Sequence, residues 1–247
     1  MGGGLGLMAG GGQRVATETT RIAMPEITIG LYPDIGASWF LNRMPPGVGA
    51  YLGLTGAQLN ARDALDLGLA DRLIAHAQRQ TVLEALADAD FASPHDTVRQ
   101  VLCEFERREQ APQAQVIPRL DVIQSLLDAA DVTGATARIL ADKRDDDWLA
   151  ANRARLAAGC PMSAHLVWRM LARHRHASLA DAFRDELNLS VQCCRHRELA
   201  EGVRALLIDK DKTPRWSHAD VASVPERDIE AFLTPLWSPE EHPLKDL

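Results

Sequence analysis

The spacing of the apolar residues changes near Gln78, and this change limits the folds open to the chain more than any other feature. Before this point, short apolar runs alternate with glycine, proline or polar residues. The runs with the length of a strand are Arg14–Thr17, Arg21–Met24 and Asp71–Ala75, and short helices are expected at 37–44, 48–56 and 61–70. Strands and helices that alternate this closely predict an α/β region with short connections.

After this point, leucine, alanine, glutamate and arginine recur with helical spacing. A long helix is expected from Ser178, because Ser178 and Asp181 have the spacing of a capping box. A further helix is expected at Glu226–Leu233, and the segment 110–118, QAPQAQVIP, is the candidate linker. We therefore predict a mixed region at 1–110 and a helical region at 111–247.

The composition excludes some classes of protein. The 247 residues are 46% hydrophobic, which is sufficient for a sizeable core. The formal net charge of -7 is spread along the chain without a basic stripe, so we expect no nucleic-acid partner. No apolar run has the length of a membrane span, so we expect no membrane partner.

The cysteines and the N-terminal residues indicate the cellular compartment in which we expect the protein. The cysteines are Cys103, Cys160, Cys193 and Cys194. Their irregular spacing predicts neither a disulfide framework nor a zinc site, and we expect no metal. The N-terminal MGGGLGLMAGGG lacks the positively charged region that opens a signal peptide. Together these features favour a reducing, cytoplasmic environment.

Two carboxylates lie in an otherwise apolar stretch, MPEITIGLYPD at 24–34. Such carboxylates are costly unless they are paired or used. The glycines and prolines of the stretch permit a loop that brings Asp34 back toward Glu26. Partial burial and a second negative charge would then raise one of the two pKa values, giving an acid and a base in one pocket. The alternative is structural: Glu26 caps a helix, and Asp34 is the N-cap of the helix that follows it.

The glycine run MGGGLGL at the N-terminus has two interpretations. Without a Cβ, a glycine N–H can approach a ligand closely. If a helix begins at Gly3 or Gly4, its unsatisfied N–H groups and its positive dipole end favour an oxyanion. The alternative is a loose N-terminal tail. A dinucleotide fingerprint is rejected, because no strand precedes the glycines.

Histidine and serine offer no clear catalytic pattern. His165 lies on an apolar helix near Trp168, and packing is expected for it. His174, His176 and His196 lie among arginines and are expected at the surface. No G-x-S-x-G motif for a serine nucleophile is present.

Four stretches carry a resemblance to a known family: MGGGLGL, RVATETTRIAMPEITIGLYPDIGASWFL, LTGAQLNARDALDLGLADRLI and CRHRELAEGVRALLIDKDKTPRW. Together they resemble the crotonase (enoyl-CoA hydratase/isomerase) superfamily, and within it the branch that hydrolyses 3-hydroxyisobutyryl-CoA in valine breakdown. The resemblance covers nearly the whole chain and is looser in its middle part. It implies a spiral of β-β-α units followed by a helical C-terminal region, with 1–110 as the C-terminal part of the spiral and 111–247 as the helical region.

The resemblance implies an acyl-CoA thioester hydrolase, with coenzyme A as part of the substrate and no separate cofactor. The thioester carbonyl oxygen would accept a hydrogen bond from the backbone N–H of Gly3, and Gly2 and Gly4 beside it would contact the substrate. Glu26 would attack the thioester or activate a water. Asp34 would position the substrate or transfer protons.

Lys210 and Lys212 have two interpretations. By resemblance they reach the phosphates of coenzyme A, and from the sequence alone they are solvated charges after a helix. The resemblance also implies a homo-oligomer, because family members often form trimers or multiples of trimers.

One position separates a hydrolase from a hydratase. Family members that hydrate double bonds carry a glutamate three residues after the middle glycine of the GGG run, where this chain has Gly6. An enoyl-CoA hydratase or isomerase is therefore the alternative function, and it lacks one acid/base partner here.

Family members also carry an N-terminal half before the GGG run, which supplies the second oxyanion N–H. We therefore expect this chain to be the C-terminal part of a longer enzyme, with little or no activity by itself. An inactive, truncated family member is the third interpretation.

Overall fold

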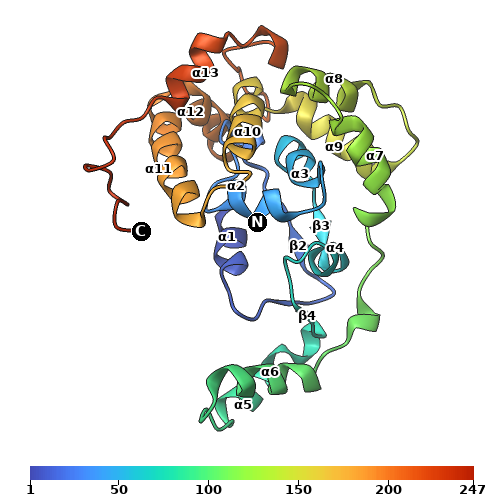
Figure 1. Cartoon of the computed structure of the whole chain (residues 1–247). Helices are drawn as coiled ribbons and strands as arrows, with labels where there is room; N and C mark the ends of the chain where they lie inside the picture. The colour runs from blue at the N-terminus through green and yellow to red at the C-terminus, as the bar shows by residue number, and fades with distance from the viewer. The chain divides into compact units, whose positions relative to one another are not determined.

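The computed structural model describes residues 1–247 and is mainly helical (Figure 1). The α-helices are α1 (Gly3–Ala9), α2 (Ala37–Phe40), α3 (Val48–Thr55), α4 (Ala61–Asp66), α5 (Arg79–Ala87), α6 (Pro94–Glu104), α7 (Leu120–Leu127), α8 (Val132–Ala141), α9 (Asp147–Ala158), α10 (Pro161–Arg173), α11 (Leu179–Arg195), α12 (Arg197–Val203) and α13 (Glu226–Leu233). The strands are β1 (Val15–Ala16), β2 (Arg21–Ile22), β3 (Leu59–Asn60) and β4 (Arg72–Leu73). The 3₁₀ and π-helical turns are η1 (Glu26–Ile29), η2 (Leu41–Arg43), η3 (His76–Gln78), η4 (Arg108–Gln110), η5 (Ile117–Arg119), η6 (Arg204–Ile208) and η7 (Val221–Ser223), of which η6 is the π-helix.

The residues form two compact units. The first unit contains residues 1–6, 23–57 and 121–247, and the second contains residues 7–22 and 58–120. Each unit is therefore assembled from segments that are far apart in the sequence. The predicted boundary at residue 110 separates the spiral part expected for the family from the helical region that follows it. This division stays a prediction.

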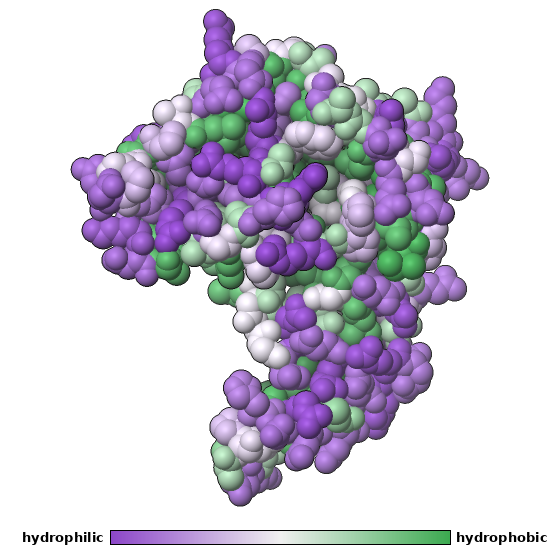
Figure 2. Space-filling view, viewed as in Figure 1, coloured by the Kyte–Doolittle hydropathy of each residue, from purple (hydrophilic) through white to green (hydrophobic).

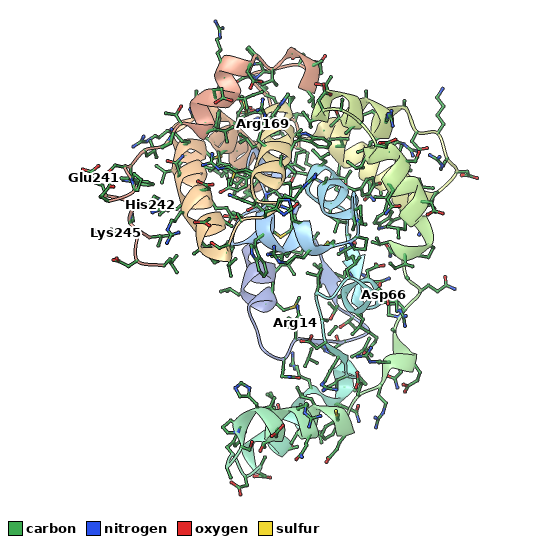
Figure 3. The ribbon with its side chains drawn as sticks, in the orientation of Figure 1. Arg14, Asp66, Arg169, Glu241, His242 and Lys245 are labelled. Atoms are coloured by element: carbon green, nitrogen blue, oxygen red, sulfur yellow. The ribbon has the colours of Figure 1, made fainter.

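All four strands lie in the second unit and form two small sheets. β1 and β4 pair in parallel, and β2 and β3 pair antiparallel. The predicted strands are in the right places, but each is shorter than predicted, because hydrogen-bonded pairing covers only two residues of each run. Near these strands Arg14, labelled in Figure 3, donates hydrogen bonds to both carboxylate oxygens of Asp71.

The candidate linker is tied to the second unit. Asp63 is fully buried and completes a capping box with Asn60 at the start of α4. The same carboxylate accepts hydrogen bonds from the backbone N–H groups of Gln115 and Val116, at 2.7 and 2.9 Å. Because Val116 is also fully buried, the segment 110–118 contributes to the packing of this unit.

The first unit has a helical core around α3 and α10. Tyr51 and Leu54 of α3, Leu166 of α10 and Ile27 of η1 are all fully buried. The bond from the Cys160 N–H to the carbonyl of Ile27, 2.9 Å long, joins η1 to the start of α10. The turn that begins at Glu26 therefore rests directly on the core.

Two predicted helix positions are confirmed, and one of two open interpretations is decided. Ser178 caps α11 in a capping box with Asp181, and α13 has the predicted bounds. α1 begins at Gly3, so the N-terminal glycines form a helix and not a loose tail. None of the helices combines the length and the hydrophobicity that crossing a membrane requires.

η1 is held from its other side by α12. A Cβ on Gly202 of α12 would lie 2.3 Å from the carbonyl carbon and oxygen of Ile29. A Cβ on Gly30, which has a φ of +74°, would lie 2.4 Å from the carbonyl oxygen of Glu198. The two backbones are therefore in direct contact, which only glycine permits at these positions.

We predict that Gly202→Ala lowers the free energy of unfolding by about 1–3 kcal/mol, because the added methyl group pushes α12 away from η1. The matched control is Gly134→Ala in α8, where a Cβ would meet its neighbours at an ordinary 3.4 Å. The control should be neutral or stabilising, since alanine is the better helix former. Equal stability of the two variants in urea unfolding would contradict the packing argument.

Candidate active site

Glu26 lies at the first position of η1 and is almost completely buried, with 6% of its surface exposed. Its Oε2 atom has no hydrogen-bond partner. Its Oε1 atom lies only 3.1 Å from the position that a Cβ on Gly2 would take. Gly2, with a φ of +59° and its N–H bonded to the carbonyl of Ala23 at 2.9 Å, therefore leaves the room that this carboxyl group occupies.

Burial raises the pKa of Glu26 to about 7. The negative charge of Asp34 contributes to this rise, while a backbone hydrogen bond and the positive charge of the N-terminus oppose it. Burial also raises the pKa of Asp34, which is half-buried. The Asp34 carboxyl group is thus near enough for its charge to act on Glu26, and Glu26 can act as acid or base near neutral pH. Their catalytic roles stay a prediction.

Neither carboxylate serves as a helix cap. The residue before η1 is Pro25, and no side chain caps that turn. The N-cap of α2 is Gly36, again without a side-chain hydrogen bond. Asp34 contributes only its backbone carbonyl, which accepts a bond of 3.1 Å from the N–H of Ala37. The structural alternative for both residues is therefore wrong.

The turn after Asp34 is fixed by Glu186 of α11. Glu186 is 3% exposed, and its carboxylate accepts hydrogen bonds from the backbone N–H of Gly36 at 2.6 Å and of Ser38 at 3.2 Å. The Ser38 hydroxyl group also donates to it. Burial raises the pKa of Glu186, while these bonds from Ser38 and Gly36 oppose the rise. Both oxygens of the Glu186 carboxylate therefore accept hydrogen bonds, whereas one oxygen of Glu26 accepts none.

His174 extends this network and corrects a prediction. It was expected at the surface, but it is 1% exposed. Its Nδ1 atom lies 2.8 Å from the Ser38 hydroxyl oxygen, and its Nε2 atom lies 2.9 Å from a carboxylate oxygen of Asp185. The serine–histidine–aspartate order is that of a hydrolytic triad, but Ser38 is 2% exposed and its hydroxyl group bonds Glu186. The set therefore braces α2 and does not face a substrate.

The other histidines are mostly structural. His165 packs as predicted, with its Nε2 atom 2.8 Å from the carbonyl oxygen of Val221. His176 is exposed, as predicted. His196 was also expected at the surface, but it is half-buried and stacks on Phe232 with ring centroids 4.0 Å apart.

The glycine run places backbone donors near the Glu26 carboxyl group. Gly3 and Gly4 form the start of α1, where the first N–H groups of a helix have no acceptor within the helix. The carbonyl of Gly2 accepts the N–H of Leu5 at 2.8 Å, which closes the first turn. A negatively charged oxygen could therefore be held near Glu26 by the N–H of Gly3, and this role stays a prediction.

Lys210 and Lys212 lie outside this arrangement. Both side chains are exposed, and both residues have positive φ values, 58° and 57°. They flank Asp211, which pairs with Arg204 at 2.7 Å. No hydrogen bond joins either lysine to the two carboxylates. Their contact with coenzyme A phosphates stays a prediction.

No group of three or more His, Cys, Asp or Glu side chains is placed to hold a metal ion. The four cysteines are free thiols, of which Cys160 and Cys193 are buried and Cys103 and Cys194 are exposed. The candidate site therefore consists of two carboxyl groups and backbone N–H donors.

Comparisons with known proteins show the family of the chain. A family model described as Enoyl-CoA hydratase/isomerase matches residues 1–233. The 3-hydroxyisobutyryl-CoA hydrolase of zebrafish mitochondria (Danio rerio) is 34% identical over 241 residues, which are 96% of this chain and 62% of that protein. The 3-hydroxyisobutyryl-CoA hydrolase 1 of Arabidopsis thaliana is 33% identical over 94% of this chain and 63% of its own length.

Solved structures show the same fold. A carnitinyl-CoA dehydratase from Mycobacterium thermoresistibile has a TM-score of 0.83 and 30% identity, covering 96% of this chain and 65% of that one. An enoyl-CoA hydratase from Rhodobacter sphaeroides has a TM-score of 0.81 and 32% identity, covering 96% of this chain and 66% of that one. The predicted crotonase-like fold class is confirmed. The chain spans less than two thirds of the length of each of these four proteins.

The raised pKa of Glu26 predicts a loss of stability as the pH rises. The pKa in the folded protein, about 7, lies above the ordinary value of 4.5. The protonated form therefore stabilises the fold below pH 4.5, and this stabilisation is lost as the pH rises through about 7. As the pH rises between these limits, the free energy of unfolding of the unchanged protein should fall by up to about 3 kcal/mol relative to that of Glu26→Gln. Urea unfolding across this range measures the difference, with the exposed Glu240→Gln as control. Parallel pH curves for all three proteins would contradict the burial argument.

Glu186→Gln should lower the free energy of unfolding by about 2–3 kcal/mol, because an amide NH₂ group would face N–H donors that need an acceptor. The matched control is Glu241→Gln, at an exposed position labelled in Figure 3, which should change stability by less than about 0.5 kcal/mol. If the two substitutions had the same effect on chemical unfolding, the anchoring role of Glu186 would be wrong.

Proposed function

Because the chain belongs to the enoyl-CoA hydratase/isomerase family, we propose that it provides the catalytic carboxylates of an acyl-CoA thioester hydrolase whose substrate is 3-hydroxyisobutyryl-CoA. The observation that carries the proposal is the buried Glu26 carboxyl group, which has one oxygen without a partner and lies beside Gly2 at the start of a helix. The names of the relatives supply the substrate.

The proposed reaction uses Glu26 as a base. At neutral pH about half of its carboxyl groups are ionised, since the pKa is about 7. The carboxylate takes a proton from a water molecule as the water oxygen attacks the thioester carbon. The negative charge that develops on the carbonyl oxygen is stabilised by the Gly3 N–H. The C–S bond then breaks, and the coenzyme A thiolate leaves and takes up a proton from Glu26 or Asp34.

A second route uses Glu26 as a nucleophile. Its carboxylate attacks the thioester carbon directly, the C–S bond breaks and an anhydride forms, which water then hydrolyses. The unpartnered Oε2 atom supports this route as well as the first. Single-turnover hydrolysis in ¹⁸O-labelled water distinguishes the two, because only the anhydride route can leave the label in the Glu26 carboxyl group.

The runner-up function is an enoyl-CoA hydratase or isomerase, or a dehydratase. Its support is that the two solved relatives are a dehydratase and a hydratase. Against it stands Gly6, which offers no side chain to hold a water at the acyl chain. An inactive family member is the third candidate, and measurable binding of a CoA thioester would argue against it.

The cellular setting belongs to the same proposal. We place the hydrolase in valine breakdown and in the cytoplasm, although the names of the animal relatives place those proteins in mitochondria. Lys210 and Lys212 would bind CoA phosphates, and the protein would assemble as a trimer or a multiple of it.

The decisive experiment measures thiol release from 3-hydroxyisobutyryl-CoA beside hydration of crotonyl-CoA. The protein is expressed with any in-frame coding sequence that precedes Met1, and a blank without substrate corrects for its four cysteines. We expect thiol release without hydration, and a fall in kcat of about 10²–10⁴-fold for Glu26→Gln. Glu240→Gln, at an exposed position, should leave kcat unchanged. Hydration without thiol release would overturn the proposal in favour of the hydratase.

A further inference from the structure

Ile35 has an unfavourable backbone conformation. Only three residues other than glycine have positive φ values, and Ile35, with a φ of 55°, is the one that is β-branched. This left-handed region is a genuine outlier for such side chains. Strain of this kind persists only where the surroundings impose it, and it is concentrated at functional sites.

Packing in the core does not explain this strain, because Ile35 is 38% exposed. Exposure by itself is common: Figure 2 shows small hydrophobic patches scattered among hydrophilic residues on the visible face. The combination of strain and exposure is what distinguishes Ile35. Its position, directly after Asp34 and before the Gly36 N–H that Glu186 holds, ties it to the candidate site.

The side chain of Ile35 covers one face of α1. A Cβ on Gly3 would lie 3.0 Å from its Cδ1 atom. A Cβ on Gly6, three residues further and on the same face, would lie 2.5 Å from both its Cγ2 atom and its carbonyl oxygen. By contrast, a Cβ on Gly4 would meet nothing within 4 Å. Ile35 therefore occupies the space that any side chain at residue 6 would need.

We propose that Ile35 determines the reaction specificity of the site. The inference rests on the proposed function and deepens it. The Ile35 side chain fills the space above Gly6, where a second acid/base group on α1 would have to stand in order to hold a water at the acyl chain. Water is thereby limited to the side of Glu26 and Asp34, where the thioester carbon would lie. The left-handed turn has two effects: it directs the Ile35 side chain onto α1, and it fixes the position of Asp34, the residue before it.

A consequence is that two substitutions are needed to admit a carboxylate at residue 6. Gly6→Glu alone drives its side chain into Ile35, including the carbonyl oxygen. Ile35→Gly removes the side chain and also frees the backbone, since glycine tolerates other conformations at this position. Only the double variant can place a carboxylate above the helix.

The first test concerns stability and does not depend on enzyme activity. Alanine normally stabilises a helix relative to glycine. We expect Gly6→Ala nevertheless to lower the unfolding midpoint by about 2–4 °C, whereas the matched Gly4→Ala should not lower it. In the Ile35→Gly background, the loss caused by Gly6→Ala should become smaller, because the side-chain contacts are gone while the contact with the carbonyl oxygen of residue 35 is still there. If Gly6→Ala and Gly4→Ala behaved alike, or if the loss were undiminished without the Ile35 side chain, the inference would be overturned.

The second test compares thiol release from 3-hydroxyisobutyryl-CoA with hydration of crotonyl-CoA in the same preparations. The rate of thiol release by Ile35→Val should stay within about tenfold of that of the unchanged protein. The rate for Ile35→Gly should fall about a hundredfold. The folded Gly6→Glu/Ile35→Gly variant should hydrate crotonyl-CoA at least about tenfold faster than either single variant. Wild-type thiol release by Ile35→Gly, or no gain in hydration by the folded double variant, would refute the role of Ile35. If the unchanged protein shows neither activity, the proposed function fails, and the stability test alone decides the inference.

Discussion

The burial of the Glu26 carboxyl group is the constraint on which the rest of the site depends. A carboxyl group with an unpartnered oxygen in the interior is unfavourable, and it stays only where its backbone is held firmly. That hold comes from two sides of η1: the start of α10 is joined to Ile27, and α12 touches Ile29 through a glycine. Neither helix can be displaced without moving Glu26. The packing of the first unit thus maintains a protonation equilibrium near neutral pH.

Two glutamates in this unit show how partners determine a role. Glu26 and Glu186 are both almost completely buried, yet Glu186 accepts three hydrogen bonds from the α2 region whereas an oxygen of Glu26 accepts none. A fully bonded carboxylate is a structural anchor, since moving a proton to or from it would break those bonds. The carboxylate with a free oxygen is available for chemistry. Burial alone would not have separated the two.

Local sequence patterns predicted much of this arrangement. The capping box at Ser178 and the bounds of α13 both depend on residues close together in the chain. The anchoring of Gly36 by Glu186 could not be predicted in this way, because the two residues are 150 positions apart. The burial of His174 was not predicted for the same reason, because its partner Ser38 is far away in the sequence. Its arginine neighbours suggested a surface position. The left-handed turn at Ile35 could not be predicted either, because a β-branched residue rarely adopts this conformation.

The central claim is that Glu26 titrates near neutral pH because of where it is buried. The most direct measurement is a ¹³C NMR titration of the carboxyl carbons, with the Glu26 signal assigned by comparison with Glu26→Gln. The account predicts a midpoint at about 7, shifted downward in Asp34→Asn because the neighbouring negative charge is gone. A midpoint near the ordinary 4.5 would contradict it, and the site would then contain a solvated carboxylate with no special acid/base function.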